Sequence, residues 1–191
     1  HKHRHASQLF GLYDLHDPLI MENDKFRSGC KKAIDRRMEI RREDNGGIMA
    51  FGMIQLAFAA SALGETETAY DMLKWLGNSY WNNNMVSTHD PKKTFNVDIC
   101  GGYPSLVMKM LVYSEPGVIS LLPCKPQDWT EGMIRGVALR GGILMKELSW
   151  TPQGVKVIFF SKTDQSVKVS LRGKQVKEIK LKAGQPMKYS F

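Results

Sequence analysis

Three of the histidines and one aspartate are candidates for ligand binding or catalysis. His3 and His5 alternate with basic residues at the start of the chain, His89 lies in the segment THDPKK, and Asp98 precedes ICGG. A spacing of two residues fits neither a helical i,i+4 ligand pair nor the common zinc patterns, which disfavours a metal site. An interrupted histidine tag, a buried hydrogen-bonded histidine and a ligand contact stay open for His3 and His5, since imidazole both donates and accepts hydrogen bonds.

Asp98 comes just before Gly101 and Gly102, where a helix is predicted to begin. Free backbone N–H groups and the helix dipole at such a position favour an ionised carboxylate. The same position suits an aspartate that only caps the helix. The residues themselves leave both roles open for Asp98, and they leave a solvent-facing loop position open for His89.

Four helices are predicted to position these residues. Phe26, Cys30, Ile34 and Met38 recur every four residues and form one apolar stripe. The stretch 48–63 is apolar all round, which predicts a buried helix that is too short for a membrane span. Further helices are predicted over 65–77, closed by Gly77, and over 101–113, with Pro104 near the first turn. Gly64 is the expected C-cap of the second helix.

The chain changes character near Glu115–Gly117, after which short apolar runs are cut by proline and glycine. Alternation in SVKVSLR and EIKLK predicts half-buried strands, and GGILMKELSWTPQGVKVIFF predicts two strands joined at TPQG. The fold class expected is therefore α+β, with helices in 1–115 and a small antiparallel, sandwich-like β domain in 116–191.

The formal net charge of +8 arises mainly in the β domain, since residues 151–191 carry nine lysines and arginines and only two acidic residues. Lysines that alternate with buried residues lie on the wet face of strands, and no aromatic residues interleave with them as a platform for bases. We therefore expect no nucleic-acid partner and no membrane partner. The three cysteines, Cys30, Cys100 and Cys124, are widely spaced and odd in number, which predicts buried free thiols.

Three segments, in order, resemble glycoside hydrolase family 95. HRHASQLFGLY (3–13) is similar to the family's His-Arg-His-Leu-Ser-His/Gln-Leu-Phe-Gly-Leu-Tyr, and STHDPKKTFNVD (87–98) is similar to Thr-His-Pro-Pro-Phe-Gln-Ile-Asp. GVISLLPCKPQDWTEGMIRGVALRGG (117–142) resembles the stretch that joins the family's barrel to its β domain. The resemblance covers nearly the whole chain, and it implies the C-terminal part of an (α/α)6 barrel followed by a β domain.

The resemblance also implies an activity and a set of site residues. Family members of the α-L-fucosidase type hydrolyse terminal α-L-fucosides, and some α-L-galactosides, with inversion and without a cofactor. By resemblance Asp98 is the catalytic aspartate on the water side of the reaction, and His3, His5 and His89 contact the sugar of an oligosaccharide or glycan. The family habit further implies a periplasmic or extracellular location.

The family's general-acid glutamate precedes the matched segments, so the chain is expected to be a fragment that is inactive alone. Glu22, Glu39, Glu65 and Glu67 lie in polar stretches and are interpreted as surface charges. A non-catalytic carbohydrate-binding or structural remnant is the alternative. Barrel helices without their neighbours should expose apolar surface, which predicts self-association or rearranged packing.

Overall fold

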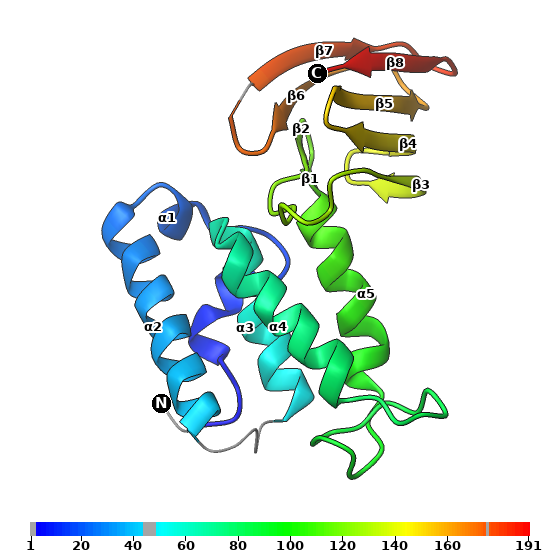
Figure 1. The fold of residues 1–191 in the computed structure, drawn as a ribbon. Helices are drawn as coiled ribbons and strands as arrows, with labels where there is room; N and C mark the ends of the chain where they lie inside the picture. Colours follow the sequence, from blue (N-terminus) through cyan, green and yellow to red (C-terminus); the bar gives the residue numbers. More distant parts are fainter. Residues whose placement is uncertain (1–2, 44–48, 175) are drawn as a thin grey trace. The chain divides into compact units, whose positions relative to one another are not determined.

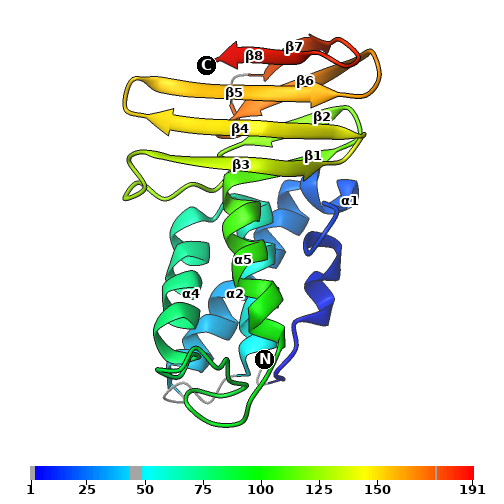
Figure 2. The ribbon, with the colours of Figure 1, turned by 90° about the vertical axis from the view of Figure 1, so that its right-hand side faces the viewer.

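The computed structural model describes residues 3–43, 49–174 and 176–191, and it divides the chain into a helical unit up to Met110 and a β unit from Leu111. Figures 1 and 2 show helices first and strands afterwards, which confirms the α+β class. The helical unit comprises η1 (Ser7–Leu12), α1 (Pro18–Met21), α2 (Asp24–Glu43), α3 (Ala50–Leu63), α4 (Thr66–Ser79) and α5 (Asp98–Leu111).

Helix α3 forms the centre of the helical unit, as its sequence predicted. Its side chains are buried almost all round, and only Phe51 is clearly exposed, at 38%. Helices α2 and α4 and the segment η1 pack against it. Gly64 adopts the left-handed conformation (φ 78°) of the expected C-cap. Ile48, with which the predicted helix began, lies outside the described residues.

The predicted apolar stripe of α2 is buried only in its second half. Ile34 and Met38 are 1% and 2% exposed, whereas Phe26 is 51% exposed and Cys30 is half-buried. Arg37 and Arg41 are buried beside Ile34 and Met38, each 6% exposed. The prediction therefore holds where α3 covers α2, and it is wrong at Phe26.

Two expected helix ends differ in the structure. Helix α4 continues past Gly77 to Ser79, and Gly77 instead gives room to Tyr103, since a Cβ there would lie 3.0 Å from the Tyr103 hydroxyl oxygen. Helix α5 begins at Asp98 rather than Gly101, so Pro104 lies inside it rather than in its first turn. A proline there removes one helical hydrogen bond, which the packing of the buried Leu106 and Met110 outweighs.

The β unit holds two four-stranded sheets, and in Figure 2 the sheet of β3, β4, β5 and β8 lies in front of the other. One sheet has the order β1-β2-β6-β7 and the other β3-β4-β5-β8. The strands are β1 (Val112–Glu115), β2 (Val118–Leu121), β3 (Gly132–Leu139), β4 (Ile143–Thr151), β5 (Gly154–Ser161), β6 (Gln165–Leu171), β7 (Val176–Leu181) and β8 (Pro186–Ser190).

The alternating strands bury one face, as predicted. Val167 and Val169 of β6 and Ile179 and Leu181 of β7 are at most 4% exposed. All strand pairs are antiparallel except β2 and β6, which run parallel, with Val118 opposite Lys168. The sandwich-like expectation is confirmed, with this one parallel pair as a departure from pure antiparallel order.

The two units divide between Met110 and Leu111, whereas the sequence placed the boundary at 115/116. Val112–Glu115, which the sequence assigned to the helical segment, forms β1 and pairs with β2. The apolar run LVY suits a helix end and a strand start equally well, so the sequence pattern does not locate this change.

The three cysteines have unlike surroundings: Cys124 is buried, Cys30 is half-buried, and Cys100 is exposed with its Sγ 3.0 Å from Ser87 Oγ. The expectation of three buried thiols is thus wrong for Cys100. No helix within the described residues combines the length and apolarity that crossing a membrane needs.

Candidate functional site

The candidate residues gather where α3 and α5 begin, at one end of the helical unit. The His5 ring meets the Phe51 ring of the first turn of α3 edge-on, with centroids 5.7 Å apart. The His3 ring lies 5.6 Å from that of His5. Asp98 opens α5 and contributes to the electrostatic field at His5. Figure 2 shows the N-terminal segment and the loop before α5 at this same end.

Buried arginines of α2 hold the segment that carries His3 and His5. Arg37 Nη1 donates to the backbone oxygens of His3 (2.8 Å) and His5 (3.0 Å), and Arg41 Nη2 donates to that of Arg4 (3.1 Å). A buried guanidinium is strongly favoured to keep such bonds, because leaving it unpaired is costly. These three bonds hold the peptide oxygens of residues 3, 4 and 5.

Gly52 of α3 lets this segment approach the helix closely. A Cβ on Gly52 would overlap the Arg4 carbonyl oxygen and would lie 2.9 Å from Arg41 Nη2. Ala6, the residue after His5, donates its N–H to Gln55 Oε1 (2.9 Å), and its oxygen accepts from the Tyr13 hydroxyl. The histidine segment is therefore bonded to both α2 and α3 along its backbone.

The environment of His5 favours the neutral imidazole. Burial lowers its pKa, and the charges of Arg4 and His3 lower it further, while Asp98 opposes them. A neutral imidazole has one donor and one acceptor nitrogen, and it can therefore bond to a hydroxyl in either sense.

The loop that contains His89 is tied to the start of α3. The backbone oxygen of His89 accepts from Ala50 N (2.8 Å), one of the free N–H groups of the first turn of α3, and its N–H donates to Thr94 O (2.7 Å). The ring Nδ1 lies 3.2 Å from Asp90 Oδ2, and the side chain is 31% exposed. His89 therefore belongs to the same end of the unit as His5, through the α3 N-terminus.

Asn96 orients Asp98. Its amide nitrogen donates to Asp98 Oδ2 (2.9 Å), and its Oδ1 accepts from Asp98 N (2.8 Å). Asn96 thus performs the capping role that was open for Asp98, and the half-buried carboxylate is held at the positive end of α5. The peptide oxygen of Asn96 in turn accepts from Ser87 Oγ (2.6 Å), which links it to the His89 loop.

The sequence interpretation missed Asn96, Arg37, Arg41 and Gly52. The position of Asn96, two residues before Asp98, was a usable signal, because asparagine side chains often bond to the backbone two residues on. The arginines gave no such signal, since charged residues are seldom buried. Gly52, inside an otherwise apolar helix, was the second usable signal, since such glycines often mark a close approach.

The glutamates considered as surface charges lie at the surface. Glu39 pairs with Arg36 (2.9 Å), and Glu65 pairs with Lys31 (2.9 Å). Glu22 and Glu67 are exposed. The described part of the chain contains no cluster of three or more His, Cys, Asp or Glu side chains able to hold a metal ion.

A polar cavity of about 560 Å3 opens in the loop that leads toward Asp98. Asn82, Asn83, Asn84 and Lys92 line it, and the Lys92 ammonium donates to the Trp81 backbone oxygen. The Trp81 ring meets that of Tyr103 of α5 edge-on, with centroids 6.3 Å apart. Amide and ammonium groups therefore line this part of the loop.

The helical unit with a polar site at its helix N-termini, and the β-sandwich that follows it in the chain, agree with the fold that the resemblance implies. A model of the glycosyl hydrolase family 95 catalytic domain matches residues 1–111, and the chain belongs to this family. The chain is similar to alpha-L-fucosidase 2 of Arabidopsis thaliana, with 28% identity over 162 residues. That match covers 78% of this chain and 18% of the relative's length.

Proposed function

We propose that this chain supplies the water-activating side of an α-L-fucosidase-type active site, with Asp98 as the general base. The observation that carries the proposal is the carboxylate of Asp98, oriented by Asn96 at the start of α5 and close enough to His5 to affect its pKa. The family membership of residues 1–111 supports a glycosidase, and the fucosidase relative supports the sugar class.

An inverting glycosidase needs an ionised base that activates water on one face of the sugar, while an acid protonates the leaving oxygen from the other face. Asp98 is suited to the first task by its place at the start of α5, where the Asn96 amide holds one oxygen of its carboxylate. Its other oxygen, Oδ1, would accept a proton from the attacking water. The substrates proposed are terminal α-L-fucosides or α-L-galactosides.

His3, His5 and His89 are proposed to bond to the sugar hydroxyls. The lowered pKa of His5 keeps its ring neutral at neutral pH, so that it offers one donor and one acceptor. The edge of Phe51 beside it adds an apolar surface for the C–H groups of a sugar ring. The fixed backbone of His3 and His5 reduces the entropy lost when the sugar is bound.

The general acid is proposed to lie outside the segment that matches the family here. Glu39 and Glu65 are engaged in ion pairs with residues of α2, and among the described residues Asp98 is held by Asn96 and by no glutamate. Without a proton donor the leaving group stays poor, so the isolated chain should release no fucose. A secreted or periplasmic location is proposed on the family resemblance.

The test measures sugar binding and hydrolysis separately. L-Fucose added to the 191-residue chain should shift the NMR signals of His5 and His89 but not those of the β unit. Asp98→Asn should weaken this binding, whereas the matched change Asp128→Asn, at an exposed position of the β unit, should leave it unchanged. Neither the chain nor its variants should release 4-nitrophenol from 4-nitrophenyl α-L-fucoside.

Hydrolysis by the isolated chain would show that the proton donor is already present, and hydrolysis that Asp98→Asn leaves unchanged would rule out Asp98 as the base. A complete lack of binding by a folded chain would favour the alternative, a structural remnant whose helical unit no longer takes a sugar.

A further inference from the structure

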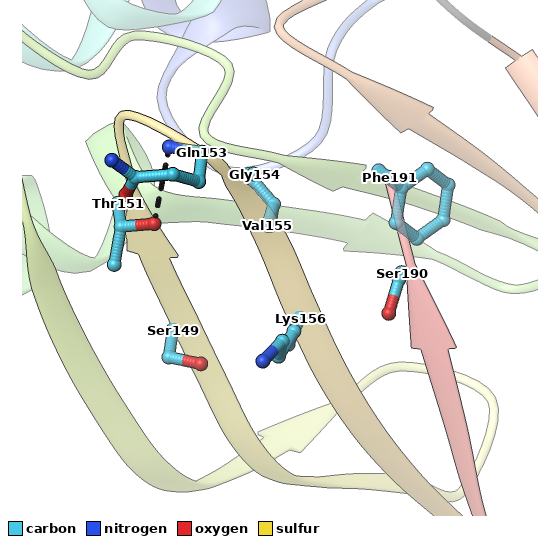
Figure 3. Close-up of a pocket in the computed structure, with 8 residues that line it drawn as sticks. All are labelled: Ser149, Thr151, Gln153, Gly154, Val155, Lys156, Ser190 and Phe191. Carbon is cyan, nitrogen blue, oxygen red and sulfur yellow. Dashed lines mark hydrogen bonds between the residues drawn. The ribbon is translucent and has the colours of Figure 1, made fainter.

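A shallow groove on the β unit carries a row of polar side chains that the glycosidase site does not use. It has a volume of about 240 Å3 and lies where β4, β5 and β8 run side by side. Its lining, drawn in Figure 3, consists of Ser149, Thr151, Gln153, Gly154, Val155, Lys156, Ser190 and Phe191.

The strand register aligns three of these side chains. Ser149 of β4 stands opposite Lys156 of β5, and Lys156 stands opposite Ser190 of β8. Neighbouring strands are about 4.8 Å apart, so a hydroxyl, an ammonium and a second hydroxyl follow one another across the sheet. Figure 3 shows the three side chains on the same face.

The charge on this face is positive. Lys188, two residues before Ser190 on β8, points to the same face by strand periodicity and stands opposite Ile158. The carboxylate of Glu147 on β4 is bound by Arg135, with Nε and Nη2 both 3.0 Å from Oε2. The neighbouring acid is therefore already neutralised, and the ammonium of Lys156 faces hydroxyl groups.

Phe191 closes one end of the row. It continues the pairing of β8 with β5, since its N–H and oxygen bond to Val155 at 2.9 and 3.0 Å. Its ring lies under the Lys177 ammonium of β7, 5.5 Å from the ring centroid. At the other side, the turn of β4 and β5 is closed by Gln153 N, which donates to Thr151 Oγ1 (3.2 Å).

We propose that this groove binds an acidic saccharide, with a carboxylate or sulfate of the sugar on Lys156 and its hydroxyl groups on Ser149 and Ser190. The row offers one charge-assisted bond and two neutral ones. The groove would hold an acidic part of a glycan independently of the α-L-fucoside site, since the residues of the two sites belong to different units.

A saccharide is favoured over a nucleic acid by the shape of the site. Strands of nucleic acid are bound through successive stacked bases on several aromatic side chains. The groove is bordered by one ring, and its polar groups are hydroxyls spaced along a single row.

Isothermal titration and NMR of the 191-residue chain can test the site with a galacturonate tetrasaccharide, a neutral maltotetraose and a short oligothymidylate as probes. The galacturonate probe should bind and shift the amide signals around Ser149, Lys156 and Ser190, and maltotetraose should bind much more weakly. Lys156→Gln should weaken binding of the galacturonate probe about tenfold, and Ser190→Ala about threefold.

Lys168→Gln is the matched control, since Lys168 is also exposed on a strand but belongs to the other sheet, on β6. It should change the affinity less than twofold, and all variants should keep the thermal transition of the parent. Equal losses in Lys156→Gln and Lys168→Gln would overturn the site in favour of bulk charge. Tighter binding of oligothymidylate, or no binding of galacturonate at millimolar concentration, would overturn the saccharide.

Discussion

At the scale of single residues, the candidate site depends on a glycine that carries no chemistry. Gly52 lies in α3 under the Arg4 carbonyl, where any side chain would overlap the peptide. The position of His5 beside Phe51 therefore depends on the lack of a side chain at Gly52, the next residue of the helix.

Gly52→Ala should destabilise the helical unit by about 2 kcal/mol, because the histidine segment must shift or detach from α3. Denaturant unfolding followed by circular dichroism measures this change. Gly29→Ala in α2 is the control: a Cβ there meets nothing within 4 Å, so it should leave stability unchanged or raise it by up to about 1 kcal/mol. Equal effects of both changes would contradict the close approach.

Asn96→Ala should cost about 1 kcal/mol of stability, since it removes the bond to Asp98 N at the start of α5. It should also free the Asp98 carboxylate, which loses the Asn96 amide. Chemical denaturation measures the first effect, and the NMR signal of the Asp98 carboxyl carbon reports the second. Asn96→Asp keeps the cap acceptor and should recover most of the stability but not the carboxylate bond.

At the scale of elements, α2 holds the histidine segment in place through hydrogen bonds to its backbone. Arg37 and Arg41 reach from its buried face to the backbone of residues 3–5, while its first half leaves Phe26 exposed. The second half of α2 therefore positions the histidine segment, whereas its first half lacks apolar cover among the described residues.

Arg37→Met should release this segment from α2 and change the titration of His5. The pKa of His5 is lowered by burial, so freeing the ring should raise it toward its ordinary value of 6.5. NMR titration of the His5 ring protons measures the shift. Arg36→Met, one residue away and paired at the surface with Glu39, should leave it unchanged.

The sign of the pH dependence follows from the same shift. Because the folded state holds a proton on His5 less tightly than the unfolded state, stability contributed by neutral His5 is complete above about pH 6.5 and is lost as the pH falls through the lowered folded-state pKa. In Arg37→Met this loss should diminish.

The elements were more predictable from the sequence than their junctions. The apolar helix α3 followed from its uniformly apolar run, its cap from Gly64, and the strands from the alternation that burial of one face imposes. The start of α5 was missed because an Asn96 side chain, and not the glycines, begins the helix. The grouping of His5 with Asp98 came from the resemblance, since contacts between positions so far apart leave no local pattern.

At the scale of the whole molecule, apolar side chains stay exposed on the helical unit. Phe10 of η1, Leu19 of α1 and Phe26 of α2 are 76%, 73% and 51% exposed. Helix α3 is itself covered by η1, α2 and α4. The uncovered surface lies on its neighbours.

We predict that these side chains drive self-association. Sedimentation velocity at increasing micromolar concentration should show a rising average mass, and Phe10→Ser with Phe26→Ser should lower it. Val176→Ser on β7 is the control, since Val176 is 69% exposed on the β unit. A concentration-independent monomer mass for the parent chain would refute the prediction.

The parallel pairing of β2 with β6 sets the order in which strands of the β unit can pair during synthesis. Strand β2 ends at Leu121, and its partner β6 starts at Gln165, so the ribosome must deliver the whole meander β3-β4-β5 before that sheet can be completed. Closing so long a loop carries an entropic cost, and contacts between distant positions form slowly. The hairpin of β1 and β2 therefore lacks its neighbouring strand β6 until the later strands have been synthesised.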